Sequence, residues 1–258
     1  MSGATPKVII IAAGLSSRMR PLTDDRPKCM LDFAGKTLLR RQLDAFGDCG
    51  LDDVAVIRGF QGDKIDLDGL RYFENPDFEN NNILNSLFYA EEAIEGDVII
   101  SYSDILFESR VVKSLLGSGE DISIVVDTDW RQYYAGRNDH PIEEAENVVF
   151  DENRHVVEIG KILTGDNDVD GEFIGMMKLT AAGAEVYKRH FHQAKQEYWG
   201  RPFQRSATFE KAYLTDLFQE MTDLGTAVHC VAIKQGWKEI DTVEDYEKAV
   251  KALKTLEE

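Results

Sequence analysis

The sequence predicts an α/β protein with a mostly parallel central sheet, and three observations support this class. Residues 8–13 form a short, unbroken apolar run, which suits a strand buried on both faces of a parallel sheet. An amphipathic helical pattern over 35–48 and a second short strand at 54–57 follow. This strand–helix–strand order with short links favours a right-handed parallel unit. The chain contains no Pro/Gly/Ser-rich linker, so we expect a single domain over 1–258.

The composition limits the classes of partner. With 258 residues, 43% of them hydrophobic, the chain can bury a sizeable core. Its formal net charge of −18 argues against binding to nucleic acid or to an anionic membrane surface. No apolar run reaches transmembrane length and no signal-peptide core is present, so we expect a cytoplasmic protein. Three cysteines without C-x-x-C spacing indicate neither a disulfide framework nor a zinc site.

The first strand leads into a loop of small residues, 14–17, and then into a cluster of positive charge. At the carboxyl end of a strand, such a loop lets backbone N–H groups approach a phosphate closely. Within 14–28, Asp24 and Asp25 are outnumbered by four basic residues, which are Arg18, Arg20, Arg26 and Lys28. On an acidic protein, this predicts a site for a small anionic ligand that is bound together with a metal cation. The loop matches neither the P-loop nor the dinucleotide-binding pattern.

The region after the second strand is polar and rich in asparagine. Residues 61–71 are predicted to be a connection and 72–73 a brief third strand. The loop 75–86 has two interpretations. It is either a solvated loop or a reader of a nucleobase edge, because asparagine and serine side chains offer both donors and acceptors. We expect Ser86 to cap the next helix.

An acidic residue follows the next buried strand, 97–101. Asp104 comes just past the carboxyl end of this strand, where α/β sheets bind ligands. A carboxylate in this place suits a Mg²⁺ ion that bridges phosphates. A helix-capping role for Asp104 is the alternative.

The second half of the chain continues with strands and helices. After a strand at 122–126, the aromatic-rich stretch 127–146 is predicted to be an ordered excursion over the site. The last helix begins at Thr242, a capping residue with acidic residues in the turn that follows. Between them we predict a hairpin of 147–150 with 156–159, a strand at 172–179, helices at 181–198 and 208–224, a strand at 226–233, and a lead-in segment at 237–241.

Three features together resemble the Rossmann-like nucleotidyltransferase family. They are the run A-A-G-x-x-S-R-M-R-P-L-T with the R-P-K that follows it, Asp104 after a strand, and Asp241 before the final helix. The resemblance implies a Rossmann-like three-layer sandwich with a mixed, mostly parallel central sheet of the nucleotide-diphospho-sugar transferase type and a small acceptor-binding lobe. It assigns about 1–125 to nucleotide binding, about 126–235 to the acceptor, and 242–257 to a C-terminal helix.

Further similarity indicates a branch of this family. The segments NNNILNSLFYAEEAIEGDVIISYSDILF, DWRQYYAGRNDHP and GEFIGMMKL resemble phosphonate and phosphocholine cytidylyltransferases, including domains fused to phosphoenolpyruvate mutases. In the implied reaction, an acceptor oxygen attacks the α-phosphorus of CTP in line, and pyrophosphate leaves. The implied acceptors are small phosphonates or phospho-alcohols such as 2-aminoethylphosphonate, 2-hydroxyethylphosphonate and phosphocholine.

The resemblance also implies roles for individual residues. The nucleotide would be held by the loop at Ala12, Ala13, Gly14, Ser16 and Ser17. Arg18 would meet the β- and γ-phosphates, and Lys28 would bridge the α-phosphate and the incoming oxygen. Asp104 and Asp241 would hold Mg²⁺. The base would be read by Asn81, Asn82 and Ser86, with Gly59 lining the same pocket.

The acceptor-binding residues match the family less closely. Lys161 follows a partial match to the E-K-P motif of sugar-nucleotide relatives, so we expect it to contact the acceptor. Arg131 and Arg137 are further candidates because a guanidinium fork suits a phosphonate, although both could equally be surface charges. Glu172 and Asp216 are candidates for binding a cationic amine on the acceptor.

Two other functions remain open at this stage. A sugar-1-phosphate nucleotidyltransferase is disfavoured by the absence of the full E-K-P motif. A non-catalytic nucleotide-binding or regulatory protein is disfavoured because Arg18, Lys28, Asp104 and Asp241 are all present. The sequence does not separate CTP from UTP or dTTP, and it leaves a homodimer open.

Overall fold

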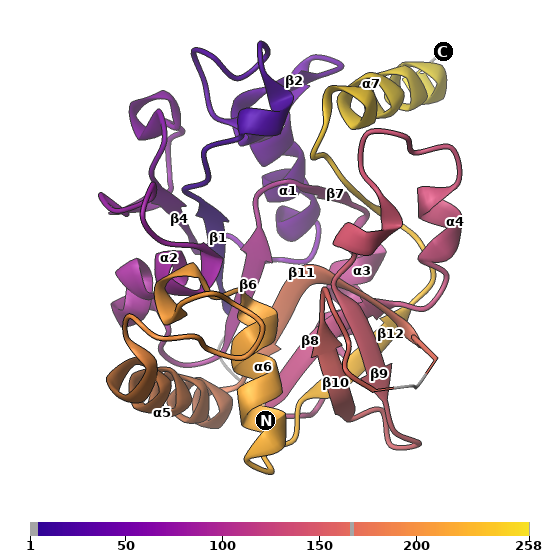
Figure 1. Cartoon of the computed structure of the whole chain (residues 1–258). Coiled ribbons are helices and arrows are strands. Elements are labelled where there is room, and N and C mark those ends of the chain that lie inside the picture. The colour runs from indigo at the N-terminus through magenta and orange to yellow at the C-terminus, as the bar shows by residue number, and fades with distance from the viewer. Residues whose placement is uncertain (1–4, 166–167, 258) are drawn as a thin grey trace.

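In a computed structural model, the described residues, 5–165 and 168–257, form a mixed nine-stranded sheet with helices on both sides (Figure 1). The strands of this sheet are β1 (Lys7–Ala12), β4 (Val54–Arg58), β5 (Arg71–Glu74), β6 (Val98–Tyr102), β8 (Ile122–Asp127), β9 (Asn147–Phe150), β10 (Val156–Gly160), β11 (Gly171–Leu179) and β12 (His229–Ile233). The helices are α1 (Leu38–Gly47), α2 (Ile83–Leu87), α3 (Ser109–Leu116), α4 (Arg131–Tyr134), α5 (Ala181–Tyr198), α6 (Leu214–Asp223) and α7 (Val243–Glu257).

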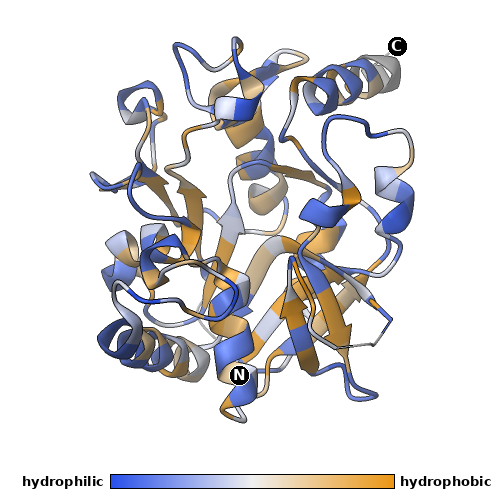
Figure 2. Ribbon diagram, viewed as in Figure 1, coloured by the Kyte–Doolittle hydropathy of each residue, from blue (hydrophilic) through white to orange (hydrophobic). Residues whose placement is uncertain are grey.

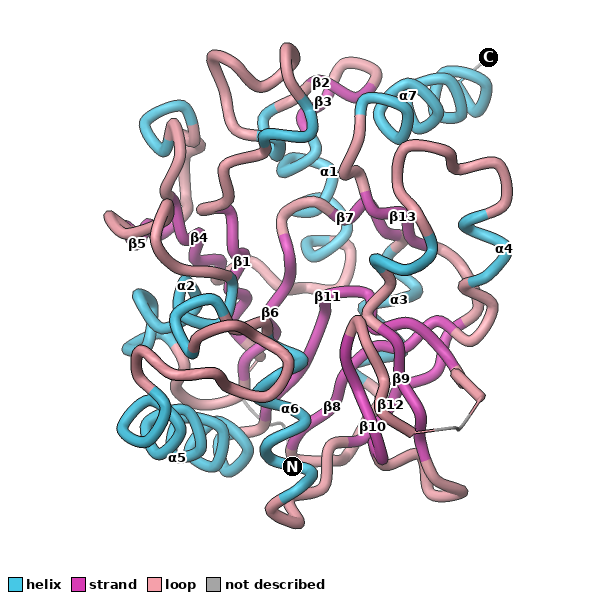
Figure 3. Tube along the Cα trace, in the orientation of Figure 1, coloured by secondary structure: helices cyan, strands magenta, loops and turns pink. Residues whose placement is uncertain are grey.

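Two small sheets accompany the large one. β2 (Asp32–Phe33) pairs with β3 (Lys36–Thr37), and β7 (Ile105–Phe107) pairs with β13 (Trp237–Glu239). Figure 3 shows β7 and β13 side by side, although β13 comes almost at the end of the chain. The second pair therefore brings the residues that follow β6 next to the residues that precede α7.

Most strands of the large sheet run in the same direction. β6, β1, β4 and β5 are neighbours in this order and pair in parallel. β11 is antiparallel to β6, and β8 is antiparallel to β11, so β8 and its parallel neighbour β12 run in the direction of β1. β9 and β10 form the predicted antiparallel hairpin, and β9 pairs with the beginning of β11. The prediction of a mixed, mostly parallel sheet is confirmed.

Helices packed on both faces of the sheet explain the unbroken apolar runs of the strands. In β1, Ile9 and Ile11 contribute to a core cluster that includes residues of α2, α5 and α6. Val8 and Ile10 contribute to a second cluster, which includes residues of α1 and α3. All four side chains are at most 5% exposed. Figure 2 shows hydrophobic residues concentrated in the strands, with hydrophilic residues on the outer helices, as a three-layer sandwich requires.

A third apolar cluster joins the region after β1 to the C-terminal helix. Met19, Leu31 and Phe33 pack there against Ile240 and Ala249. This contact places the start of α7 beside the loop that follows β1. Within the described ranges, no helix combines the length and the apolarity needed to cross a membrane.

Several element boundaries differ from the expectation, each for a local reason. The helix expected over 35–48 begins only at Leu38, because Thr37 ends the β2–β3 turn and its Oγ1 accepts a hydrogen bond from Arg40 N at 3.1 Å. Ser86 does not cap a helix, because it lies inside α2 and Asn82 is the N-cap. The helix expected over 208–224 is a short 3₁₀ turn followed by α6. The helix expected over 181–198 is confirmed as α5.

Candidate active site

A cavity of about 460 Å³ lies where the carboxyl ends of β1 and β6 meet the β7–β13 pair. Among the residues singled out from the sequence, its lining includes Ala12, Ala13, Gly14, Ser16, Ser17, Arg18, Lys28, Asn81, Asn82, Ser86, Asp104, Lys161, Glu172 and Asp241. Residues from both halves of the chain therefore meet at one site. The remaining four candidates, Gly59, Arg131, Arg137 and Asp216, lie outside the lining.

The loop after β1 is held over the end of its strand by hydrogen bonds. Ser16 adopts the left-handed backbone conformation, with φ 54°, before a short 3₁₀ turn at Ser17–Met19. Lys28 N donates to Ser16 Oγ at 3.3 Å, and Thr23 Oγ1 donates to the Ser16 carbonyl oxygen at 2.8 Å. Apart from Gly14 itself and its two neighbours in the chain, no atom of the described residues lies within 4 Å of the place that a Cβ of Gly14 would occupy. The loop is thus anchored at Ser16 and leaves open space at Gly14, as a phosphate-binding loop requires.

Lys28 is the centre of the charged cluster. Its Nζ donates to Asp104 Oδ2 at 3.1 Å and to Asp241 Oδ1 at 2.8 Å. The guanidinium of Arg18 pairs with the other oxygen of Asp241. The Lys28 and Asp241 side chains are only 11% and 6% exposed, whereas that of Arg18 is 53% exposed. The cluster therefore has a buried core and one accessible cation beside the loop.

The charges of this cluster stabilise one another. Burial by itself would lower the pKa of Lys28, but Asp104 and Asp241 outweigh it and hold this pKa above its ordinary value. Burial by itself would raise the pKa of Asp241, but Lys28, His140 and Arg18 lower it well below its ordinary value. Lys28 is therefore a cation and Asp241 an anion throughout the moderate pH range.

The same carboxylates fit a divalent cation. Asp104 and Asp241 contact one ammonium group, so their oxygens border a common small volume. Asp104 Oδ1 is buried and has no hydrogen-bond partner among the described residues. His140 and Glu239 offer further ligand atoms, which lie within 4.8 Å of each other and of an Asp241 oxygen. Since carboxylate oxygens are the ligands that Mg²⁺ prefers, the donor set suits this ion.

The asparagine-rich loop is a hydrogen-bonded wall of the cavity. Asn75 Nδ2 donates to Asn81 Oδ1 at 3.0 Å and to Ser86 Oγ at 2.7 Å. Asn82 caps α2, and its Nδ2 donates to the Lys211 carbonyl oxygen at 3.1 Å. Asn75 is 1% exposed. These contacts order the loop at the cavity edge, and the base-reading roles stay predictions.

Lys161, carboxylates and aromatic rings form another end of the cavity lining. Lys161 Nζ pairs with Glu144 at 2.8 Å and lies 4.9 Å from the centre of the Tyr213 ring. Glu172 Oε1 accepts a hydrogen bond from the Tyr134 hydroxyl at 2.6 Å. Burial raises the pKa of Glu172 to about 8. This end of the cavity can therefore hold a zwitterion, with Lys161 for its anionic group and buried carboxylates for its cationic group.

Two arginines proposed for the acceptor make their contacts elsewhere. Arg131 packs over the Trp130 ring and donates to the Val169 carbonyl oxygen at 3.4 Å, outside the cavity lining. Arg137 is buried and binds Asp245 through Nε at 2.7 Å and through Nη2 at 2.9 Å. Since its charge is neutralised within the protein, Arg137 is not available to a phosphonate in this arrangement.

Asp216 and Gly59 also lie outside the cavity lining. Asp216 caps α6, where it accepts hydrogen bonds from Tyr213 N at 2.8 Å and from Ser206 Oγ at 2.7 Å. A Cβ on Gly59 would stand 2.6 Å from the Ala13 carbonyl oxygen and 2.9 Å from Phe78 Cβ. Gly59 therefore packs closely against the loop at Ala13, outside the cavity lining, and its role at the base stays a prediction.

Some lining residues escaped the sequence reasoning. They include Tyr102, His140, Glu144, Glu146, Tyr213 and Glu239. The acidic run at 143–146 has the composition of a solvated surface, and only the fold shows that Glu146 is 8% exposed. One usable signal was the place of Glu239, two residues before Asp241.

The chain is similar in sequence and in fold to several cytidylyltransferases. A CTP:phosphoglutamine cytidylyltransferase from Campylobacter jejuni is 27% identical over 93% of this chain and 97% of that protein. A CMP-5'-(3-aminopropyl)phosphonate synthase from Streptomyces rubellomurinus is 29% identical over 44% of this chain, which is 19% of that longer protein. The structure of a CTP:phosphocholine cytidylyltransferase from Streptococcus pneumoniae superposes with a TM-score of 0.70 at 20% identity, covering 96% of this chain and 98% of that one.

The family is shown by a match that contains the loop after β1 and Asp104. The profile of the family described as "MobA-like NTP transferase domain" matches residues 8–167. These residues make up more than half of the sequence. The chain therefore belongs to the MobA-like NTP transferase family, and it is a nucleotidyltransferase with cytidylyltransferases among its relatives.

Proposed function

We propose that this protein transfers CMP from CTP to a small, amine-bearing phosphonate or phosphate ester and releases pyrophosphate. The observation that carries the proposal is the position of Lys28, held between Asp104 and Asp241 beside a loop of small residues in one cavity. CTP as the donor is supported by relatives that are cytidylyltransferases.

The proposed chemistry needs positioning and charge neutralisation more than a covalent participant. The backbone of 13–17 holds the triphosphate, and Arg18 binds the β- and γ-phosphates that leave. Lys28 Nζ binds the α-phosphate. It stabilises the negative charge that builds up while the acceptor oxygen bonds to the α-phosphorus and the bond from this phosphorus to the β-phosphate oxygen breaks.

Asp104 and Asp241 are the residues that would hold Mg²⁺ in this proposal. The bound ion supplies positive charge for the α-phosphate oxygens. The unpartnered Asp104 Oδ1 supports this role, because a buried carboxylate oxygen without a partner is costly. Arg18 and Lys28 then complete the neutralisation from the side of the loop.

The proposed acceptor carries a cationic group as well as a phosphonate or phosphate. Glu172 lines the cavity and is 4% exposed. Its Oε2 has no hydrogen-bond partner among the described residues. Glu146 also lines this cavity, and so do the aromatic residues Tyr102, Tyr213 and Trp237. Buried carboxylates and aromatic faces are the groups that bind an ammonium. Lys161 is the partner for the phosphonate.

The relatives agree with such an acceptor. Phosphoglutamine and aminopropylphosphonate, the compounds in the names of two relatives, both contain an amino group in addition to a phosphoryl group. The candidate acceptors for this chain are therefore 2-aminoethylphosphonate, phosphocholine and phosphoglutamine, with 2-hydroxyethylphosphonate as the comparison that lacks a cationic group.

The test is pyrophosphate release with Mg²⁺, using each NTP in turn with each acceptor. CTP-selective release with an amine-bearing acceptor would support the proposal. Release only with sugar 1-phosphates would overturn it in favour of a sugar-nucleotide enzyme, and release with UTP or dTTP in place of CTP would overturn the donor. No release with any pair would favour a regulatory nucleotide-binding protein.

A matched pair of acceptors tests the cationic group directly. 2-Aminoethylphosphonate and 2-hydroxyethylphosphonate differ in one terminal group. We expect the wild-type protein to prefer the amine in kcat/KM, and Glu172→Gln to reduce this preference. Equal kcat/KM values for the two acceptors in the wild-type protein would remove the amine from the proposal and leave nucleotidyl transfer intact.

A further inference from the structure

The segment 130–146 is fastened to the start of α7 by a buried ion pair, and this ion pair lies beside Asp241. We propose that Arg137 is a positioning residue that orients Asp241 for divalent-cation binding by locking onto Asp245. The inference rests on the proposed metal-binding role of Asp241. It gives Arg137 a function inside the protein in place of the acceptor contact that its sequence context suggested.

The pair has the geometry of a rigid clamp. Arg137 donates to both oxygens of Asp245, and its Nη2 also contacts Glu239 Oε2 at 3.1 Å. The Arg137 and Asp245 side chains are 2% and 4% exposed. The guanidinium lies 4.6 Å from the centre of the Tyr133 ring. A bidentate pair that is enclosed in this way has a single low-energy arrangement, in contrast to an exposed pair.

Asp245 transmits this arrangement to the Asp241 backbone. Its Oδ2 accepts hydrogen bonds from Asp241 N at 3.1 Å, from Thr242 N at 2.9 Å and from Thr242 Oγ1 at 2.8 Å. The carboxylate that pairs with Arg137 therefore also fixes the backbone of residues 241–242, just before α7. Asp241 projects into the cavity from this turn.

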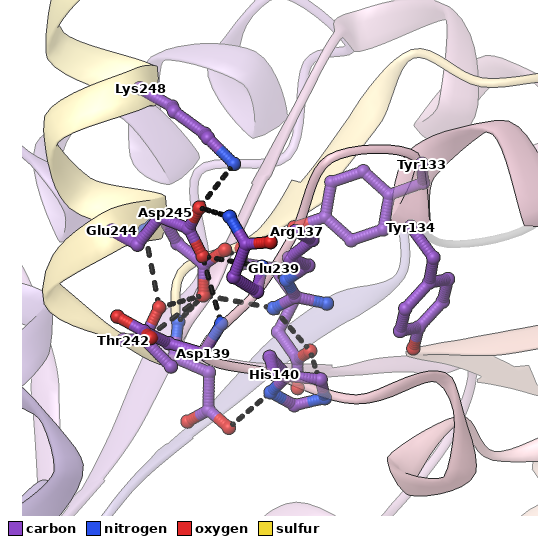
Figure 4. A network of polar contacts seen from close by, with 12 residues as sticks. Tyr133, Tyr134, Arg137, Asp139, His140, Glu239, Thr242, Glu244, Asp245 and Lys248 are labelled. Atoms are coloured by element: carbon purple, nitrogen blue, oxygen red, sulfur yellow. Dashed lines mark hydrogen bonds and ion pairs between the residues drawn. The ribbon is translucent and has the colours of Figure 1, made fainter.

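A second set of contacts closes the clamp from the other side. Glu244 accepts hydrogen bonds from Asn138 N at 2.8 Å and from Asp139 N at 2.9 Å. Lys248 pairs with Glu244 at 2.7 Å (Figure 4). The loop that is held in this way ends at His140. The His140 Nδ1 lies 3.2 Å from Asp241 Oδ2. Asp241 is thus constrained through its backbone by Asp245 and beside its carboxylate by the loop that Arg137 anchors.

The physical consequence concerns metal affinity. A lysine at 137 would keep the positive charge but could not bind both oxygens of Asp245 in one plane. Asp241 would then sample orientations that do not suit an ion held jointly with Asp104. Loss of a residue that orients a metal ligand weakens metal binding by about 10–100-fold. The nucleotide loop lies outside the clamp, so the KM for CTP should change less than the metal affinity.

The experiment measures Mn²⁺ binding to the full chain without substrates, from the electron paramagnetic resonance signal of free Mn²⁺. We expect Arg137→Lys and Asp245→Asn each to weaken Mn²⁺ binding at least about tenfold. Because both substitutions break the Arg137–Asp245 pair, the double variant should bind Mn²⁺ about as weakly as the weaker single variant, and not with the two losses multiplied. Arg71→Lys is the matched control, since Arg71 makes an exposed ion pair with Asp53 and should leave Mn²⁺ binding unchanged.

Melting temperatures separate positioning from unfolding, and a folded variant with wild-type Mn²⁺ affinity would overturn the inference. A fall in activity without a fall in Mn²⁺ affinity would instead assign Arg137 to a substrate. Failure of the proposed function would give a different result from failure of this inference. If no donor and acceptor react, the wild-type and variant proteins still differ in Mn²⁺ affinity. If the wild-type protein binds no Mn²⁺, the metal role of Asp241 and this inference fall together.

Discussion

Replacing Glu172 with glutamine is expected to change how the stability of the protein depends on pH. Glu172 lies on β11 with 4% exposure, accepts one hydrogen bond from Tyr134, and leaves Oε2 without a hydrogen-bond partner among the described residues. Burial raises its pKa from 4.5 to about 8, although the hydrogen bond from Tyr134 partly opposes this. Glutamine keeps the shape of the protonated carboxyl and removes its titration.

The magnitude follows from linkage. Each pKa unit corresponds to about 1.4 kcal/mol, so a pKa raised from 4.5 to about 8 corresponds to about 5 kcal/mol. The folded state holds the proton more tightly than the unfolded chain. The stabilisation is therefore complete below about pH 4.5 and is lost as the pH rises to about 8. The wild-type protein should lose on the order of 5 kcal/mol of unfolding free energy relative to Glu172→Gln across this window.

Urea unfolding of both proteins at several pH values within this window measures the difference. The difference should grow steadily as the pH rises and should level off above about pH 8. Glu152→Gln, at an exposed position away from the cavity, is the control and should follow the wild-type curve. Parallel curves for the wild-type protein and Glu172→Gln would refute the reasoning that Glu172 is buried and uncharged near neutral pH.

Three further substitutions test the nucleotide end of the site. Lys28→Gln should lower kcat by about 10²–10³, as on loss of one transition-state donor, and unchanged kcat in a pyrophosphate-release assay would exclude Lys28 from the chemistry. Asp104→Asn should raise the Mg²⁺ concentration needed for half-maximal release, and a wild-type Mg²⁺ titration would contradict the metal assignment. Gly59→Ala should raise the KM for CTP, because the new Cβ would stand 2.6 Å from the Ala13 carbonyl oxygen and would displace the loop. It should also lower the free energy of unfolding by about 1–3 kcal/mol. A wild-type KM together with a wild-type melting temperature would show that the loop accommodates the added methyl group without loss of stability or CTP binding.

The sequence predicts those parts of the fold whose signals are local. The apolar run of β1 and the small-residue loop after it lie within a few positions of each other, so the local sequence predicts the strand and the loop together. The helix at 181–198 has a cap at Thr180 and a helical apolar pattern, and its predicted bounds match those of α5. The resemblance to a family then placed Asp104 and Asp241, which the cavity brings together with Lys28.

The rest depends on contacts between distant parts of the chain. Arg137 and Asp245 are 108 positions apart, so nothing near Arg137 shows that its charge is already neutralised. Ser86 has the residue type of a helix cap, but Asn82 takes that place because the helix begins earlier. Glu146 has the composition of a surface residue, yet the Tyr102 hydroxyl donates to it at 3.2 Å inside the cavity. Propensity and spacing contain no information on such pairings.

The proposed reaction should depend on pH through the acceptor and not through CTP, because the acceptor end of the cavity has carboxyl groups with pKa values near neutral pH. At the nucleotide end, the pKa of Lys28 is raised and that of Asp241 is lowered, so neither group changes its charge near neutral pH. At the acceptor end, burial raises the pKa of Glu146 to about 7 and that of Glu172 to about 8. The kcat/KM for phosphocholine, whose quaternary ammonium cannot titrate, should therefore rise with pH as these carboxyls ionise. The KM for CTP should stay nearly constant over the same range. Glu172→Gln should flatten the rise for phosphocholine, and an equal pH response of both substrates would place the titrating group at the nucleotide end.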